Sequence, residues 1–397
     1  MRIGLDLTNL NPDYRGGSNT YSEGLLQGII SSNYKNNLQV YVNKYYYLKK
    51  KLKRKKNKIS YVIYERNGLI IFLNKIYNRV FPFLTFFIGK YKYFFDYKIR
   101  NFLNASFKNI VEKNCDILIT PNVTLTTYNL KVPTIVNPHD IQQVHFPELF
   151  SFKERLLRDY TYYNTVKYSS KIIASLNYIK KDLLKHYTFL KSSKIKVIYA
   201  GIDLKKYNSK KLRINKKKDY IFFPSQLWPH KNHLLVLNAY KKYLKKSKKK
   251  IKLILSGQNS GKFSDNILYK VQSISPKHIK YLGPISHKKL LEMYKSSICT
   301  ICPAIYEASA LPMLESFALK TFVMISNIPS HIEEAKNYNV LNFKYNSKKS
   351  LEKKFLLLDN LKKIDLKKIN NRNYNIVKKY SWKNQSIKWL NICTKII

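Results

Sequence analysis

The sequence predicts an α/β protein made of two domains, and two observations support this. Its 397 residues exceed what one hydrophobic core usually holds and suit two domains of ordinary size. Short apolar runs that are typical of buried strands are followed by helical patterns in both halves of the chain, first at residues 2–7 and again from residue 220. Ligands bind at the strand ends of such folds, so functional residues are expected in the loops that follow the strands.

The first predicted strand leads into a loop that contains Gly16 and Gly17, and a helix is predicted from Ser18 or Asn19. Adjacent glycines before a helix allow backbone N–H groups to approach a phosphate or a sugar ring closely. We therefore expect Gly17 to contact a ligand. The alternative is a glycine pair in an ordinary structural turn.

Residues 44–103 combine lysines with aromatic and aliphatic side chains. The apolar run at residues 80–89 is about half as long as a membrane-spanning helix and contains a proline, so we do not expect it to cross a bilayer. An apolar surface flanked by lysines is typical of a segment that binds an anionic membrane peripherally. The alternative is that Phe83, Phe86 and Phe87 face the protein core.

Apolar runs near residues 115–121 and 132–138 predict two further strands, and the second leads into His139 and Asp140. A histidine at a strand end can hydrogen-bond a substrate hydroxyl or stabilise developing charge, so His139 is a candidate catalytic residue. A loop histidine with a structural role is the alternative.

In the second half, the strand that begins at Tyr220 leads into a loop with Lys231 and then a helix that begins at Leu234. Lys231 is the candidate cation for a phosphate group, and His230 or His233 could supplement its charge. A zinc site at the two histidines would need further ligands that the sequence does not offer.

Two carboxylates stand together in a chain that has only 23 acidic residues. Glu307 follows an apolar run that predicts a buried strand, and Glu315 follows Pro312, which suits the first turn of a helix. A helix start favours a phosphate, and a nearby carboxylate can accept hydrogen bonds from ribose or sugar hydroxyls. The alternative is that Glu315 only complements the helix dipole and that Glu307 is an exposed loop acid.

Together these segments resemble the retaining glycosyltransferases of family 4 over nearly the whole chain. The resemblance implies the GT-B fold, in which two Rossmann-like domains face each other across a cleft. It implies that Glu307 lies near the transferred sugar, Glu315 binds the nucleoside ribose and Lys231 binds the donor diphosphate. It also implies that His139 lies beside the sugar and that Gly17 faces the cleft.

The sequence departs from this family at three positions. Gln226 stands where an arginine is common, and Ala310 and Lys320 stand where glycine is usual. The resemblance places an acceptor-side domain at residues 1–204 and a nucleotide-sugar domain at residues 205–379. Residues 380–397 are expected to form a helix that returns to the first domain. Residues 205–218 are mainly Lys, Asn and Ser, so they are expected to form a solvated linker.

The resemblance implies transfer of a hexose or an N-acetylhexosamine, with mannose preferred, from a nucleoside diphosphate sugar to a glycan or lipid-linked acceptor in cell-surface polysaccharide synthesis. Retention of configuration is implied, and no cofactor or metal is expected. One rival is a sugar-nucleotide epimerase of the same fold. The other is a non-enzymatic polyanion-binding protein, suggested by the net charge of +51. No nucleic-acid-binding motif is present, so no nucleic-acid partner is expected.

Composition adds two expectations. Four cysteines do not form a disulfide framework in a chain of this size, and Cys299 and Cys302 lie in a strand-like run that favours buried thiols over a metal site. The chain starts directly with a strand pattern and without a signal-peptide pattern, so a cytoplasmic protein at the inner face of the cell membrane is expected. The abundance of Lys, Asn, Ile and Tyr could also reflect an A/T-rich genome, in which case part of the charge has no function.

Overall fold

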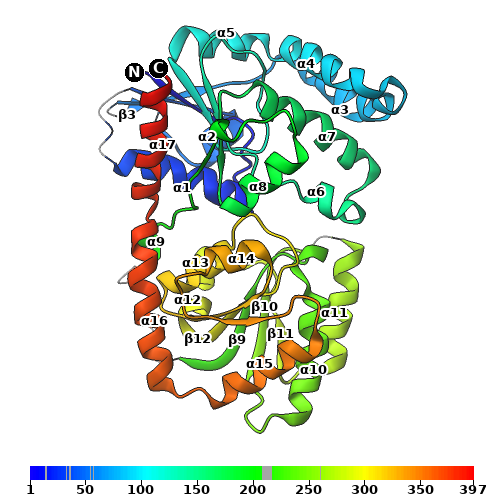
Figure 1. The fold of residues 1–397 in the computed structure, drawn as a ribbon, viewed down its shortest axis with the longest axis vertical. Coiled ribbons are helices and arrows are strands. Elements are labelled where there is room, and N and C mark those ends of the chain that lie inside the picture. Colours follow the sequence, from blue (N-terminus) through cyan, green and yellow to red (C-terminus); the bar gives the residue numbers. More distant parts are fainter. Residues whose placement is uncertain are drawn as a thin grey trace. The chain divides into compact units, whose positions relative to one another are not determined.

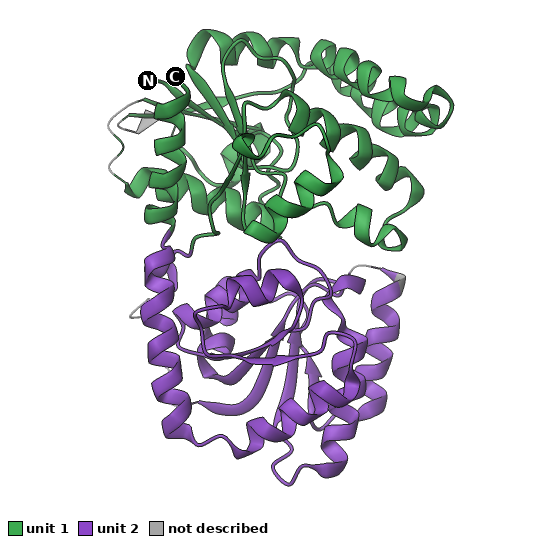
Figure 2. Ribbon diagram, viewed as in Figure 1, with its two compact units in different colours: residues 1–201, 382–397 green, residues 202–381 purple. Residues whose placement is uncertain are grey.

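The computed structural model describes residues 1–13, 16–32, 34, 37–53, 55–56, 58–207, 217–259 and 261–397 (Figure 1). Most of the predicted linker, residues 208–216, lies outside the described residues, as do Arg54 and Asn57 of the lysine-rich stretch. The chain forms two compact units, residues 1–201 with 382–397 and residues 202–381 (Figure 2). Each unit contains a mainly parallel sheet and helices, so the predicted α/β class with two Rossmann-like domains is confirmed.

Unit 1 contains a sheet with the strand order β3-β4-β2-β1-β5-β6-β7-β8, in which β3 alone is antiparallel to its neighbour among the described strands. Its strands are β1 (Ile3–Leu7), β2 (Leu38–Val42), β3 (Lys55–Lys56), β4 (Ile59–Ile63), β5 (Ile117–Thr120), β6 (Thr134–Val136), β7 (Lys171–Ala174) and β8 (Ile195–Val197). Its helices are α1 (Gly17–Ser31), α2 (Lys44–Lys49), α3 (Gly68–Ile88), η1 (Gly89–Tyr91), α4 (Lys92–Leu103), α5 (Ala105–Asn114), α6 (Gln142–His145), η2 (Pro147–Leu149), α7 (Phe152–Tyr168), α8 (Asn177–His186), η3 (Ser192–Lys194) and α17 (Trp382–Ile396).

Unit 2 contains a parallel sheet with the order β11-β10-β9-β12-β13-β14. Its strands are β9 (Lys218–Pro224), β10 (Lys252–Ser256), β11 (Ile279–Tyr281), β12 (Ser297–Cys302), β13 (Phe322–Ser326) and β14 (Leu341–Phe343). Its helices are α9 (Leu204–Tyr207), η4 (Pro229–Lys231), α10 (His233–Lys246), α11 (Lys262–Ile274), α12 (His287–Ser296), α13 (Leu311–Ala318), α14 (Pro329–Glu334), α15 (Lys348–Asn360), α16 (Lys363–Val377) and η5 (Lys378–Tyr380).

Inner strands of both sheets include some that are buried along their whole length, as their continuous apolar sequences predict. All five residues of β1 and all five of β13 are buried, because helices cover both faces of a parallel sheet.

The four cysteines are reduced and buried, and Cys299 and Cys302 lie in β12. The predicted interpretation of this pair as core thiols therefore agrees with the structure.

The C-terminal helix α17 packs against α1 inside unit 1. The Trp382 ring meets the Tyr21 ring edge-on, with 4.9 Å between the ring centroids, and Trp382 is almost fully buried. A Cβ atom at Gly24 in α1 would lie 2.2 Å from the Trp382 ring, so only glycine allows the two helices to approach this closely. The chain passes from unit 1 to unit 2 after residue 201 and returns to unit 1 after residue 381, whereas the predicted boundaries lie after residues 204 and 379.

Gly24→Ala should lower the free energy of unfolding by about 1–3 kcal/mol, because a core that cannot accept the added Cβ must shift. Helix propensity alone would give the opposite sign, since alanine stabilises a helix interior by about 1 kcal/mol over glycine. Gly68→Ala is the matched control, because no heavy atom lies within 4 Å of a Cβ at that position. Chemical denaturation measures both, and a gain in stability at residue 24 would contradict the close packing.

Candidate active site

The candidate site of unit 2 lies where its strand order reverses. The chain runs outward from β9 through β10 to β11 on one side, and from β12 through β13 to β14 on the other. Loops that leave the carboxyl ends of β9 and β12 therefore diverge here, and this switch point is where open α/β sheets bind ligands. Lys231 follows β9 and Glu307 follows β12, and the Ile305 amide donates to the His230 carbonyl at 2.9 Å.

Lys231 and Glu307 form an ion pair at this point. The Lys231 Nζ donates to the Glu307 Oε1 at 2.8 Å, and the buried His331 places its Nε2 3.7 Å from the Oε2. The Glu307 side chain is only 9% exposed. Burial raises the pKa of Glu307, but Lys231 and His331 outweigh it and lower the pKa to about 2. Glu307 is therefore a carboxylate at neutral pH and acts as a hydrogen-bond acceptor, not as an acid.

Glu315 lies in α13 and is held by two tyrosines. Tyr207 donates to its Oε1 at 2.7 Å and Tyr294 donates to its Oε2 at 2.6 Å. Burial raises the pKa of Glu315, and the hydrogen bonds from Tyr294 and Tyr207 act in the opposite direction. A carboxylate has about four lone-pair sites, so these two bonds fix its orientation and leave acceptor capacity for a ligand hydroxyl.

The two positions where the family usually has glycine differ in backbone conformation: Ala310 is unstrained and Lys320 is left-handed. Ala310 precedes the helix with φ of −88°, a value that any residue adopts. Its amide donates to Glu334 at 2.7 Å, and Ser309 donates to the other Glu334 oxygen at 2.5 Å, so a carboxylate already lies at the helix start. Lys320 follows the helix with φ of +53°, which is the left-handed conformation that a glycine would adopt without strain.

Unit 1 contains His139, directly after β6. Its φ is +58°, and the Asn137 Oδ1 holds this turn by accepting from the His139 amide at 2.8 Å. The ring meets the Tyr21 ring edge-on at 5.2 Å, and its buried Nε2 has no hydrogen-bond partner among the described residues. Burial lowers the pKa of His139 to about 4, so the ring is neutral at pH 7. A strained backbone beside an unsatisfied polar atom is a pattern that occurs at functional sites.

Gly17 is the first residue of α1 rather than part of the preceding loop, so the predicted helix start was one or two residues late. Gly16 caps the helix without a side-chain hydrogen bond. Tyr21 lies one helical turn after Gly17, and its ring contacts the His139 ring. The predicted site residues Gly17 and His139 therefore lie in the same region of unit 1.

Four residues with clear roles were not predicted. They are Tyr207 and Tyr294, which hold Glu315, His331, which lies beside Glu307, and Glu334, which holds the loop before α13. His331 and Glu334 belong to the short helix α14 that follows β13, so the rule that functional residues follow strands could have pointed to them. Nothing in the sequence spacing marks the two tyrosines.

The hypothesis that His233 supplements the charge of Lys231 is wrong. His233 is fully buried and stacks on Phe223, with 4.2 Å between the ring centroids. Burial and the nearby Lys231 and His230 lower the pKa of His233 to about 3, so it carries no charge at neutral pH. The His233 ring packs in the core of unit 2.

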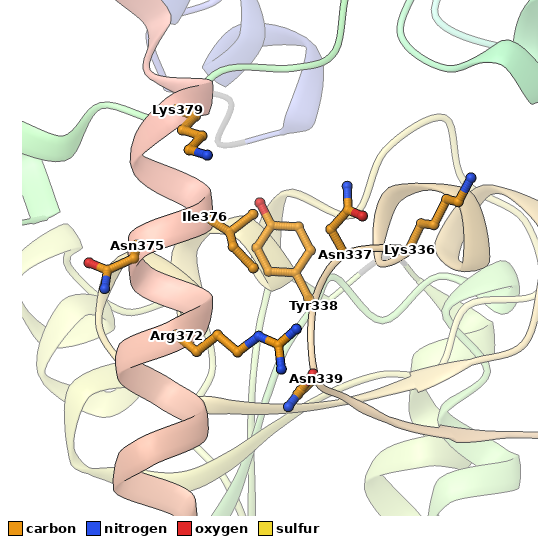
Figure 3. Close-up of a pocket in the computed structure, with 8 residues that line it drawn as sticks. All are labelled: Lys336, Asn337, Tyr338, Asn339, Arg372, Asn375, Ile376 and Lys379. Atoms are coloured by element: carbon orange, nitrogen blue, oxygen red, sulfur yellow. The ribbon is translucent and has the colours of Figure 1, made fainter.

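A hollow in unit 2 has a volume of about 760 Å³ and lies beside α16 (Figure 3). It is lined by Lys336, Asn337, Tyr338, Asn339, Arg372, Asn375, Ile376 and Lys379. Basic and amide groups surround it, and none of the predicted site residues lines it. The ion pair at the switch point is therefore the better candidate for the reaction site.

Comparison with known proteins supports the class that this geometry suggests. Residues 205–375 match the family model of the glycosyl transferases group 1. The matched segment includes Lys231, Glu307 and Glu315. The match covers less than half of the chain and lies within unit 2, and the predicted resemblance to this kind of glycosyltransferase is confirmed for the matched segment.

Two known mannosyltransferases match part of the chain. The chain is 27% identical to the O-antigen chain mannosyltransferase RfbU of Salmonella typhimurium over 195 residues, which cover 49% of this chain and 52% of that protein. It is 27% identical to the O-antigen chain mannosyltransferase B of Escherichia coli over 113 residues, 28% of this chain and 29% of that protein. The match thus spans about half the length of the first relative and less of the second.

Solved structures share the fold over the whole chain. A glycosyltransferase from Rickettsia africae has a TM-score of 0.69 at 18% identity, with 100% of this chain and 98% of that chain covered. Anabaena Alr3699/HepE in complex with UDP-glucose has a TM-score of 0.71 at 14% identity, and the trehalose-6-phosphate synthase OtsA has 0.73 at 12%, each with full coverage of both chains. The predicted GT-B fold is therefore confirmed.

Lys320→Gly should raise the free energy of unfolding by up to about 1 kcal/mol, because glycine adopts the left-handed conformation without the steric cost that a Cβ adds. The lost contact between the Lys320 amine and the Tyr374 ring, 4.9 Å from its centroid, offsets part of the gain. Lys320→Ala keeps the Cβ and should give no gain. Thermal and chemical denaturation measure the difference, and equal stability of the two variants would show that backbone strain is not the cause.

Proposed function

We propose that this chain is a retaining glycosyltransferase that moves a sugar from a nucleoside diphosphate sugar to a glycan or lipid-linked acceptor. The single observation that carries the proposal is the Lys231–Glu307 pair at the switch point of the unit 2 sheet, inside the segment that matches group 1 glycosyltransferases. The names of the relatives support mannose as the transferred sugar, and HepE in complex with UDP-glucose supports a nucleoside diphosphate donor.

In the proposed reaction, Lys231 binds the donor diphosphate and stabilises the charge that grows on it as the sugar leaves. A leaving nucleoside diphosphate carries about two to three negative charges, and in a site without a metal, lysine and backbone N–H groups must stabilise them. Gln226 adds no charge where the family commonly has arginine. Lys231 therefore bears a larger share of this stabilisation than it would in a site with two cations.

The two glutamates then have separate tasks. Glu315, oriented by Tyr207 and Tyr294, accepts hydrogen bonds from the ribose hydroxyls. Glu307, kept ionised by Lys231 and His331, accepts hydrogen bonds from the sugar. Both roles need an ionised acceptor in a fixed position, and partners fixed before the donor binds lower the cost of ordering the site.

Retention is proposed to occur by front-face attack. The bond between the anomeric carbon and the phosphate oxygen breaks, a bond to the acceptor oxygen forms on the same face, and the acceptor proton moves to the leaving phosphate. His139, neutral at pH 7, and the start of α1 at Gly17 are proposed to bind the sugar from unit 1.

Incubation of the protein with a nucleoside diphosphate mannose or with UDP-glucose, with and without glycan acceptors, tests the activity. Acceptor-dependent release of the nucleoside diphosphate is expected, whereas isomerisation of the donor without acceptor would overturn the proposal.

Glu315→Ala and Lys231→Ala should each weaken binding of the nucleoside diphosphate about tenfold to a hundredfold, because each removes a charged partner worth about 1.5–3 kcal/mol. Lys289→Ala and Glu292→Ala are matched controls. They break an ion pair of the same unit whose atoms lie 3.6 Å apart and whose side chains are 54% and 32% exposed. Isothermal titration calorimetry measures the affinities. Unchanged binding in both site variants would rule out this site.

His139→Ala should lower kcat about tenfold to a hundredfold and leave the affinity for nucleoside diphosphate unchanged, because the lost hydrogen bond serves the sugar. His145→Ala is the control, since the His145 Nε2 contacts Asp182 at 2.8 Å in the same unit. The pKa of about 4 also means that wild-type kcat should show no titration of His139 between pH 5 and 8. Loss of nucleotide affinity with normal kcat would contradict this role.

A further inference from the structure

Helix α3 carries an apolar stripe that faces solvent. Its residues are Leu69, Phe72, Ile76, Val80, Phe83 and Phe87, and their exposed fractions range from 43% to 83%. Their spacing of three or four residues puts them on one side of a helix over a length of about 27 Å. Among the described residues of α4 and the preceding turn, Tyr91, Phe94, Phe95 and Phe102 are also exposed.

The stripe is not the side of α3 that packs against the core. Another side of the same helix packs there. Tyr77 and Phe81 are buried in a cluster with Leu103 and Tyr160, and α3 and α4 both contact α7. The buried Asp96 of α4 accepts hydrogen bonds from Tyr77 and from Asn164, the latter at 2.6 Å. The α3–α4 pair, residues 68–103, is thus fixed to unit 1 beside α7 (Figure 1), and its exposed apolar residues form a second apolar side.

The exposed charges within residues 68–103 have one sign. Lys75, Arg79, Lys90 and Lys98 are exposed, and Asp96, the one acidic residue of residues 68–103, is fully buried. Lys75 and Arg79 directly precede Ile76 and Val80 of the stripe. None of the helices within the described residues is both long and apolar enough to cross a membrane.

We propose that the α3–α4 pair is a membrane-docking surface that inserts its apolar stripe into a bilayer rich in anionic lipid. A helix of this kind lies in the interface, about 5–10 Å deep, with basic residues at the headgroups. A second copy of the chain would bring the same basic residues against each other, whereas an anionic bilayer satisfies both the apolar stripe and its charges. This inference goes beyond the proposed function, because docking requires neither a donor nor an acceptor.

Sedimentation with phosphatidylcholine vesicles, with and without phosphatidylglycerol, tests the charge contribution. The variant with Lys75→Gln, Lys90→Gln and Lys98→Gln should bind the anionic vesicles about a hundredfold more weakly, since each basic residue near the surface contributes about 1 kcal/mol. The matched control, Lys241→Gln, Lys242→Gln and Lys245→Gln, removes three exposed charges from α10. Equal weakening by both triple variants would show that net charge, and not this surface, drives binding, and would overturn the proposal.

Fluorescence tests insertion of the stripe. Phe87→Trp should show blue-shifted emission that brominated lipids quench, whereas Ile364→Trp on α16, at a site of 63% exposure, should not. Phe83→Ser with Phe86→Ser and Phe87→Ser should lower the partition coefficient at least about tenfold, and the single change Phe87→Ser should lower it in the same direction. Exposed positions leave the fold intact, which circular dichroism checks.

Two further results would overturn the proposal. One is equal vesicle binding by the wild type and the folded phenylalanine variants. The other is absence of vesicle binding together with a concentration-dependent dimer that these variants abolish, which would make a second copy the occupant. Nucleoside diphosphate affinity should be unchanged in every variant of the α3–α4 pair, so failure of docking and failure of the proposed sugar transfer are measured separately.

Discussion

The ion pair between Lys231 and Glu307 is the constraint on which the organisation of unit 2 depends. The two residues are 76 positions apart and meet only because β9 and β12 are neighbours in the sheet. A partly buried charge without its partner is costly, so the loops after both strands must keep their positions together. His331 and Glu334 reinforce this arrangement from α14, the first beside Glu307 and the second at the amide of Ala310. Sheet order, loop position and charge thus support one another.

Acidic residues are scarce in this chain, and those at the site are matched individually. Glu307 is paired with a cation, Glu315 with two tyrosine hydroxyls and Glu334 with a hydroxyl and an amide. Their surroundings shift the pKa in different directions: Lys231 and His331 lower the pKa of Glu307, whereas burial raises the pKa of Glu315 and Glu334. Neutral hydroxyl donors orient the Glu315 carboxylate without neutralising it, so its remaining lone pairs stay available for further hydrogen bonds.

The sequence was sufficient where a local pattern determines the structure. Continuous apolar runs predicted the buried strands, and Pro312 predicted a first helical turn because proline lacks the N–H that such a turn leaves unpaired. It was insufficient where contacts join distant segments, since Tyr207 reaches Glu315 across 108 residues and no spacing rule encodes that. The sequence marked Lys320 as standing where glycine is usual, but it did not show that the lysine itself adopts the left-handed backbone of a glycine. His233 was misjudged because exposure, which decides whether a histidine can be charged, is a tertiary property.

Helix α3 shows why the same limit applies to surfaces. Its sequence is apolar on more than one side, and periodicity alone cannot tell which side will be covered. Folding resolves the question through α7 and the buried Asp96, which fix the side that bears Tyr77 and Phe81. Packing thus determines which side of α3 remains exposed. Residues 68–103 expose basic side chains and no carboxylate, so this surface favours an anionic partner. Lysines occur over the whole exterior of this protein, but the α3–α4 surface also exposes apolar side chains. Those apolar side chains would distinguish docking at this surface from attraction by charge alone.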